Sequence, residues 1–203
     1  GFADMMNQKA QELGMTGSHF TNPHGLHDED HYTTAADLSK LAIAAMQNPV
    51  FAECVATKEY TTSPTNKAPQ GHALVTTNRL ISPKEQYAEF NYAPAIGIKT
   101  GATNAAQGCL VAAARKDGRT LIAVLMGDST WGSNGDKYVS RWTDAVKLFE
   151  YGFGLTRVDI APILSPISLS ATLPGGSAPV SLRADVPESL GFWTDAQTAA
   201  SIT

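Results

Sequence analysis

The tripeptide Lys99-Thr100-Gly101 stands at the end of an apolar run and is followed by a second apolar run. A lysine ammonium carries a positive charge and three hydrogen-bond donors, and a threonine hydroxyl can donate to the same ligand. Glycine has no Cβ, so an extended peptide can lie against a strand at that position and add a strand to the sheet. Together these residues favour an anionic, peptide-like ligand.

The same tripeptide also fits a purely structural strand, because a strand that ends in Thr-Gly is commonplace. A structural α/β domain without chemistry is therefore one alternative. The elements around the tripeptide must decide between the two interpretations.

The composition is that of a globular protein with one substantial core and part of a second domain, since 43% of the 203 residues are hydrophobic and 17% are charged. Fifteen Lys and Arg residues stand against 19 Asp and Glu, a net charge of -4. This balance argues against nucleic acid as a partner. The first ten residues lack the basic-then-apolar order of a signal peptide.

Metal and cofactor chemistry are not expected. Four of the five histidines lie in one loop, but Asn22-Pro23 and His24-Gly25 punctuate turns there, so His27 and His31 lack the helical geometry of a zinc site. Neither cysteine has metal-ligand spacing, and we expect both to be small buried hydrophobes. The two cysteines are Cys54 and Cys109.

Helical spacing of apolar residues predicts a helix that ends at Gly14 and a second one over residues 33–48, capped by Thr33 or Thr34. Pro49 can open a short helix after it. One or two short strands are expected between residues 58 and 81, before a polar loop.

A β-hairpin is predicted after Gly101, because Asp117-Gly118 joins two apolar runs and glycine accepts the positive φ of hairpin turns. Both runs lack strict alternation, which indicates burial on two faces. A long helix should follow up to Phe153, with Trp142 and Phe149 packed in the core.

The chain changes character after Phe153, where prolines and alternating polarity indicate short strands and Pro174-Gly175-Gly176 indicates a turn. We therefore divide the chain into residues 1–154 and a small β-rich module, residues 155–203.

Several blocks of the chain resemble one family: "MNQKAQELGM", "HFTNPHGLHDEDHYTTAADLSKLAIAAM", "TNRL", "GIKTGATNAAQGCLVAAARKDGRTLIAVLMG" and "RWTDAVKLFEYGF". They are similar to the serine D-alanyl-D-alanine carboxypeptidases, the low-molecular-weight penicillin-binding proteins, whose third motif is Lys-Thr-Gly. The resemblance implies an α/β (α+β) fold of the β-lactamase and transpeptidase type. We expect an antiparallel sheet with helices on both faces, here incomplete, followed by the start of a β-rich C-terminal domain.

The resemblance also assigns the site. Lys99 and Thr100 would belong to the catalytic machinery and, with Gly101, hold the terminal carboxylate of a peptidoglycan stem peptide or of a β-lactam. The backbone amide of Ala102 would be one donor of the oxyanion hole. Thr103 is expected to border the groove, and Arg141 to help bind the substrate carboxylate.

One departure from the family pattern matters most. The chain contains neither the Ser-x-x-Lys nor the Ser-x-Asn motif, which lie upstream in the family. The acylated serine and its lysine base would then belong to a missing N-terminal segment of the same protein, either a separate chain of a nicked protein or residues removed from this chain. The chain alone should be inactive and prone to aggregate, and the whole protein should work without a cofactor in the bacterial cell envelope, outside the cytoplasm.

Two further functional alternatives stay open. A class A β-lactamase shares the third motif. A non-catalytic module that binds peptidoglycan or β-lactams would keep the carboxylate-binding strand without performing chemistry.

Overall fold

A computed structural model describes residues 1–133, 135–160, 167–172, 179–184 and 190–202. The chain forms two compact units, residues 1–153 and residues 154–203. No helix in the described part of the chain has the length and apolar character that crossing a membrane would require.

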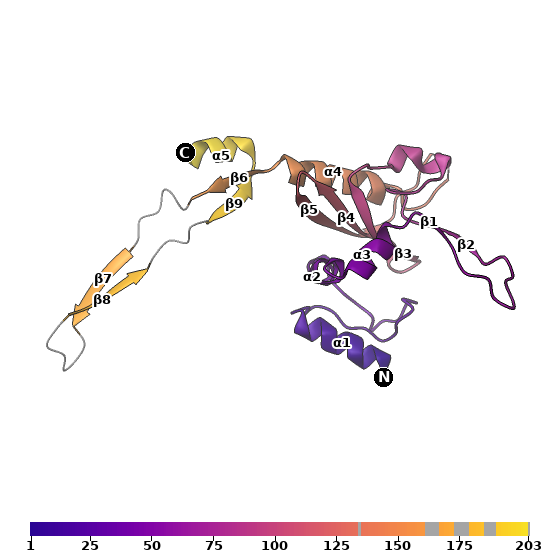
Figure 1. Cartoon of the computed structure of the whole chain (residues 1–203), viewed down its shortest axis with the longest axis horizontal. Coiled ribbons are helices and arrows are strands. Elements are labelled where there is room, and N and C mark those ends of the chain that lie inside the picture. The colour runs from indigo at the N-terminus through magenta and orange to yellow at the C-terminus, as the bar shows by residue number, and fades with distance from the viewer. Residues whose placement is uncertain (134, 161–166, 173–178, 185–189, 203) are drawn as a thin grey trace. The chain divides into compact units, whose positions relative to one another are not determined.

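The first unit contains four α-helices and five strands in its described residues (Figure 1). Its helices are α1 (Phe2–Glu12), α2 (Ala35–Met46), α3 (Pro49–Ala56) and α4 (Ser140–Gly154), with a 3-10 turn, η1, at Glu85–Phe90. Its strands are β1 (Glu59–Thr61), β2 (Ala73–Val75), β3 (Ala95–Thr103), β4 (Gln107–Lys116) and β5 (Arg119–Asp128).

The central sheet is antiparallel, in the order β3-β4-β5, so that β3 lies at its edge. The predicted hairpin is confirmed: Lys116 pairs with Arg119, and the two residues between them, Asp117 and Gly118, have φ values of 50° and 74°. Two successive positive φ angles are typical of the type I′ turn, whose twist matches that of the flanking strands.

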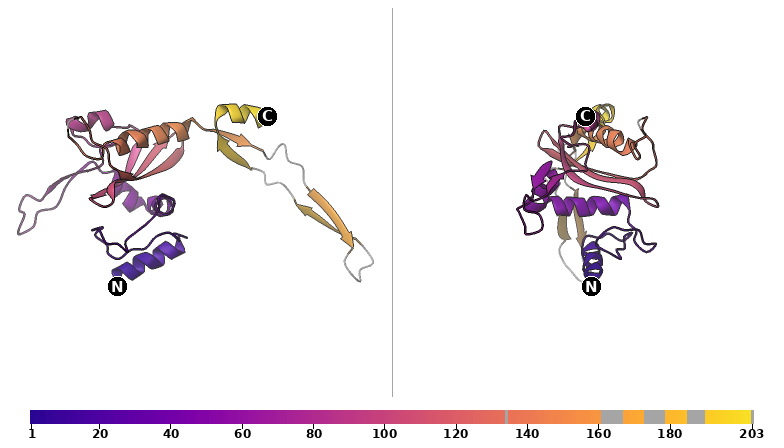
Figure 2. Two further views of the ribbon diagram at one scale, coloured as in Figure 1. Left: turned by 180° about the vertical axis from the view of Figure 1, so that it is seen from behind. Right: turned by 90° about the vertical axis from the view of Figure 1, so that its right-hand side faces the viewer.

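Helices cover both faces of this sheet, as the fold class predicts (Figures 1 and 2). On one face α4 packs through the fully buried Trp142 and Phe149 against Leu110 and alternate residues of β4. On the other face α2 and α3 contact Ala113 and Ile98. Successive residues of β4 therefore serve opposite cores, which is why its sequence lacks polar alternation.

The helix starts follow the capping residues of the sequence. The Thr34 hydroxyl accepts the amide of Asp37 at the start of α2, and the Asn48 side chain accepts the first free amides of α3, which has Pro49 in its first turn. The backbone of β3 comes very close to α3 at Gly97. Gly97 has φ +143°, and a Cβ there would stand 2.8 Å from Val55 Cγ2. That site requires glycine.

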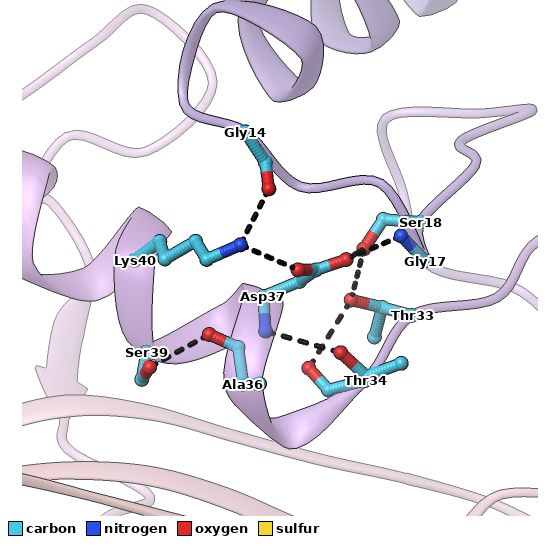
Figure 3. A network of polar contacts seen from close by, with 9 residues as sticks. All are labelled: Gly14, Gly17, Ser18, Thr33, Thr34, Ala36, Asp37, Ser39 and Lys40. Carbon is cyan, nitrogen blue, oxygen red and sulfur yellow. Dashed lines mark hydrogen bonds and ion pairs between the residues drawn. The ribbon is translucent and has the colours of Figure 1, made fainter.

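A buried polar network joins the segment after α1 to α2 (Figure 3). The Asp37 carboxylate, 4% exposed, accepts hydrogen bonds from the Gly17 amide and the Ser18 hydroxyl, both at 2.8 Å. Lys40 forms an ion pair with Asp37 at 3.3 Å and donates to the Gly14 carbonyl. Burial alone would raise the pKa of Asp37, but these bonds to its charged form outweigh burial and hold the pKa below its usual value.

The second unit contains two separate strand pairs and a helix among its described residues. Strands β6 (Thr156–Asp159) and β9 (Gly191–Thr194) pair, as do β7 (Ile167–Thr172) and β8 (Pro179–Ala184), and α5 spans Ala196–Ile202. The turn expected at residues 174–176 lies outside the described residues.

The expectation that both cysteines are buried is wrong. Cys54 is exposed on α3, and Cys109 on β4 is partly buried. The exposure of each cysteine follows from its position in the fold. Cys54 lies near the end of α3, beside a cavity, and Cys109 lies where β4 borders a cleft. Both thiols are free.

Candidate active site

The expected site residues follow one another along the outer strand of the sheet. Lys99 is exposed, Thr100 is partly buried, and Gly101 and Ala102 are exposed. Among the described strands β3 pairs only with β4, so alternate backbone groups of β3 face away from the sheet. The Lys99 ammonium donates to the carbonyl of Thr100. This edge offers a positive charge beside main-chain groups on which an extended peptide can pair.

The hydroxyl of Thr100 has a partner that the motif analysis did not foresee. Thr77 Oγ1 lies 2.7 Å from Thr100 Oγ1, so one of these hydroxyls donates to the other. Thr77 follows β2 and precedes the turn that begins at Asn78. The block "TNRL" carries Thr77, but only the fold places it beside Thr100. The pair fixes the orientation of the Thr100 side chain at the strand edge.

Gly101 has open space around it. A Cβ built on Gly101 would meet no heavy atom within 4 Å. Packing within the described residues therefore does not require glycine there, in contrast to Gly97. The open side leaves room for a peptide backbone at close range.

Thr103 is the last residue of β3, and its hydroxyl is engaged in the turn that follows. Its Oγ1 accepts the amide of Ala106 at 2.9 Å and so closes the turn between β3 and β4. Thr103 still borders the cleft described next, with its hydroxyl engaged in the turn.

A cleft of about 710 Å³ lies beside β3. All five residues from Lys99 to Thr103 line it, and its other walls are α2, part of α3, strand β4 and the loop that carries Leu26 and His31. The side chains of Leu38, Leu41 and Phe51 make much of its surface apolar. An apolar cleft that ends at a lysine and a threonine is typical of a site that buries part of its occupant and orients it by a few polar groups.

Arg141 lies behind the strand and is absent from the residues that line the cleft. Its Nη1 donates to the carbonyl of Gly101 at 2.9 Å and to that of Cys109 at 3.0 Å. Its guanidinium stacks 4.6 Å from the Trp142 ring. Burial lowers the pKa of Arg141, but an arginine remains charged at any physiological pH. Arg141 thus binds β3 and β4 together at the position of Gly101.

Asp128 explains how Arg141 is placed. The Asp128 carboxylate accepts the backbone amide of Arg141 at 3.0 Å and the hydroxyls of Ser140 and Thr130 at 2.9 and 2.6 Å. It therefore caps the first turn of α4 from the end of β5. Burial would raise the pKa of Asp128, but the hydrogen bonds from Thr130, Arg141 and Ser140 outweigh it and lower the pKa. Asp128 stands twelve residues before Ser140, the first residue of α4, so it gives no local capping signal and the sequence analysis missed it.

Two histidines of the loop before α2, His19 and His31, each bond to a main-chain group. His19 Nδ1 lies 2.6 Å from the carbonyl of Asp30, and His31 Nδ1 accepts the amide of Thr21. Across the described residues, no cluster of three or more His, Cys, Asp or Glu side chains has the geometry to hold a metal ion.

The fold and the site together place Lys99, Thr100 and Gly101 on the outer strand of an antiparallel sheet, beside a largely apolar cleft. Residues 1–130 match the model of the Peptidase S11 family, D-alanyl-D-alanine carboxypeptidase. The chain belongs to this family.

Curated relatives include a D-alanyl-D-alanine carboxypeptidase from Streptomyces, 34% identical over 157 residues that are 76% of this chain and 49% of the relative. A second, DacB2 from Mycobacterium tuberculosis, is 36% identical over 152 residues, 74% of this chain and 47% of the relative. This chain therefore spans about half the length of these relatives.

Solved structures give the same result. The Streptomyces DD-transpeptidase aligns with a TM-score of 0.63 at 33% identity, covering 75% of this chain and 53% of that one. A D-alanyl-D-alanine carboxypeptidase from Mycobacterium tuberculosis aligns with a TM-score of 0.62 at 35% identity, covering 76% and 53%. The fold of the first unit is that of these enzymes.

Proposed function

We propose that this chain forms one side of the active site of a serine D-Ala-D-Ala carboxypeptidase, which removes the terminal D-alanine of peptidoglycan stem peptides and is acylated by β-lactams. The observation that carries the proposal is the position of Lys99-Thr100-Gly101 on the free edge of β3, beside a cleft, in a member of this family. The activity requires a serine and a lysine base from a segment of the same protein outside this chain.

The chemistry is an acyl transfer in two steps. The serine oxygen attacks the carbonyl carbon of the penultimate D-alanine while the lysine base takes the hydroxyl proton. The C–N bond then breaks, the leaving nitrogen takes that proton, and D-alanine departs. Water next attacks the acyl-enzyme, so that the shortened peptide leaves with a carboxylate and the serine regains its proton. Two covalent steps replace one difficult hydrolysis.

The residues of this chain bind and stabilise. Lys99 and Thr100 hold the terminal carboxylate by charge-assisted hydrogen bonds, and the Ala102 amide donates to the developing oxyanion. A peptide that places its C-terminus at Lys99 and its scissile carbonyl at Ala102 runs antiparallel to β3. Gly101 lets that peptide approach, and Thr103 borders its upstream residues.

Arg141 is also assigned to carboxylate binding in this proposal. Its contact with the Gly101 carbonyl keeps the guanidinium close to the strand that Lys99 and Thr100 occupy. Its charge therefore adds to the positive potential at the end of the groove, while its hydrogen bonds hold the strand.

The α2 side of the apolar cleft is the proposed place of the serine-bearing segment, and the side along β3 is left to the peptide. Leu38 and Leu41 of α2 line the cleft together with Leu26, which is 67% exposed. Burying such side chains against another segment is favourable, at about 25 cal/mol per Å² of apolar surface. A helix or loop seated there would bring its serine to Lys99 and Ala102.

The setting follows from the substrate. Peptidoglycan stem peptides lie outside the cytoplasm, so the proposed enzyme works in the bacterial cell envelope. Residues 155–203 are proposed to begin a β-rich C-terminal domain of this enzyme.

The test uses the full-length protein, meaning this chain with the serine-bearing segment. We expect it to release D-alanine from a pentapeptide that ends in D-Ala-D-Ala and to gain the mass of one penicilloyl group with penicillin. Lys99→Ala should lower kcat/KM about 10- to 100-fold, the effect of losing a hydrogen bond to a charged group. Lys147→Ala is the matched control, because Lys147 is 76% exposed on α4 and away from the groove.

Three results would overturn the proposal. Equal activity of Lys99→Ala and the wild type would return Lys-Thr-Gly to a structural role. Rapid turnover of penicillin, rather than a stable adduct, would make the protein a β-lactamase. A full-length sequence without Ser-x-x-Lys that still binds β-lactams would make it a non-catalytic binding module.

A further inference from the structure

A second, smaller cavity lies at the other side of Lys99 and Thr100. Its volume is about 380 Å³, and it is bounded by the end of α3, by the β1–β2 hairpin and by Ile98, Lys99 and Thr100 of β3. It shares Ile98, Lys99 and Thr100 with the large cleft, whereas Gly101, Ala102 and Thr103 line only the large cleft. The two cavities therefore extend from Lys99 and Thr100 to different parts of the molecule.

The residues of β3 that line the small cavity indicate which part of a bound peptide it would contact. In the proposed complex, the terminal carboxylate lies at Lys99 and Thr100, and the upstream residues lie toward Thr103. The large cleft accompanies those upstream residues. The small cavity reaches only from Ile98 to Thr100, so it lies beside the last residue of the peptide.

The exposed surface of this cavity is more apolar than polar, although Lys58 and Glu59 also line it. Val55, Tyr60, Leu74, Val75 and Ile98 supply the apolar part of the lining. The hairpin is fixed by pairing of Tyr60 with Leu74 and by the Thr76 amide, which donates to the Lys58 carbonyl at 2.9 Å. The Thr77–Thr100 hydroxyl pair joins this wall to β3.

A terminal D-alanine presents only a methyl group, which fills little of such a space. We propose that the small cavity is a specificity subsite for the side chain of the terminal D-amino acid, and that it admits apolar side chains larger than methyl, such as that of D-leucine. This inference rests on the proposed function, because the carboxylate at Lys99 sets the position of the terminal residue. Each additional methylene that is buried there favours binding about fourfold.

The experiment compares two peptides that differ only in their last residue, one ending in D-Ala-D-Ala and the other in D-Ala-D-Leu. The full-length protein should cleave both, with kcat/KM for the D-leucine peptide at least equal to that for the D-alanine peptide. Leu74→Trp should fill the cavity and lower the ratio of D-leucine to D-alanine release at least about fivefold. Ala73→Trp is the matched control, because Ala73 is the exposed neighbour on β2 and is not part of the lining.

A second measurement does not depend on turnover. Cys54 is exposed and lines the small cavity, whereas Cys109 lines the large cleft. The peptide that ends in D-Ala-D-Leu should slow alkylation of Cys54 by iodoacetamide more than the D-Ala-D-Ala peptide does. Mass spectrometry of the two cysteine peptides separates this effect from protection of Cys109.

The outcomes distinguish the two proposals. D-alanine release without D-leucine release, or an unchanged ratio in Leu74→Trp together with equal protection of Cys54 by both peptides, would overturn the subsite. If neither peptide loses its last residue, the proposed function fails. In that case the Cys54 protection still decides whether the cavity binds the larger side chain, and equal protection would mean that another segment of the protein fills it.

Discussion

The hydroxyl of Thr100 is held by one neighbour, Thr77, at 2.7 Å. Since this contact orients the Thr100 hydroxyl, we expect Thr77 to influence a bound carboxylate through Thr100. We predict that Thr77→Val, which keeps the shape and removes the hydroxyl, lowers kcat/KM for D-Ala-D-Ala peptides about 2- to 10-fold, the net value of one neutral hydrogen bond.

Steady-state kinetics on the full-length protein checks this prediction. The effect should fall mainly on KM if the hydroxyl pair orients a carboxylate donor, since ground-state binding is then weakened. Thr61→Val, an exposed threonine on β1, is the control. An equal loss in both variants would mean that hairpin stability, and not the hydroxyl pair, sets the activity.

Gly101 gives a prediction that separates binding from stability. A Cβ at Gly101 would meet no atom within 4 Å, so we expect Gly101→Val to leave the thermal midpoint of the full-length protein within about 2 °C. The same side chain would occupy the path of a peptide on β3, so acylation by penicillin should slow at least about 10-fold.

Thermal melts and the rate of adduct formation by mass spectrometry measure the two quantities. Normal acylation with an unchanged midpoint would show that the ligand does not approach this part of the strand.

At the level of elements, Asp128 links the end of β5 to the first turn of α4. We predict that Asp128→Ala lowers the free energy of unfolding by about 1–2 kcal/mol at neutral pH, the usual cost of losing a helix cap. Arg141 should also shift, because its backbone amide loses its acceptor.

The pH dependence follows from the lowered pKa of Asp128. A carboxyl whose pKa is lower in the folded state stabilises above its unfolded pKa of about 3.9, and this stability is lost as pH falls through the folded pKa. The difference between wild type and Asp128→Ala should therefore be largest above about pH 5 and shrink below pH 4. Denaturant unfolding across this range measures it, and a constant difference would exclude the ionised carboxylate as the cause.

Local signals were sufficient to predict several elements. Thr34, Asn48 and Pro49 mark helix starts through their own bonds, and Asp117-Gly118 sets a turn through its φ angles. The two short strands β1 and β2 are also confirmed. The sequence analysis expected a polar loop over residues 85–90, where the structure has a 3-10 turn. The local sequence does not reveal this turn, because its one buried side chain, Phe90, packs on a core formed by distant residues.

The site shows the same limit. Lys99 to Thr103 are consecutive, so a sequence motif can present them as a group, and their roles remain predictions. Thr77 contacts Thr100 only because the β1–β2 hairpin folds back beside β3, and Asp128 contacts Arg141 only because α4 packs against the end of β5. Arg141 was expected at the substrate, and the structure adds its two main-chain contacts, which depend on the register of β3 with β4.

For the whole molecule, the uncovered apolar surface leads to a prediction about the 203-residue chain in isolation. Phe2, Met5 and Val50 are each more than 60% exposed, and the large cleft is lined by apolar side chains of α2. Exposed apolar surface of this kind favours self-association. We expect the isolated chain to form oligomers or aggregates and to melt over a broad range.

Size-exclusion chromatography and calorimetry test this directly, with the full-length protein as the comparison. A monodisperse isolated chain with a sharp, cooperative transition would contradict the prediction and would also weaken the case for a segment seated in the cleft.

The edge position of β3 has a consequence for how the backbone exchanges its amide protons with water. In an edge strand, alternate amides bond to the neighbouring strand and the others point outward. Exchange along Ala95–Thr103 should therefore alternate between slow and fast residues, a two-residue rhythm that β4, paired on both sides, should lack. A ligand that adds a strand would slow only the fast set, so deuterium uptake resolved by residue would record both its presence and its register.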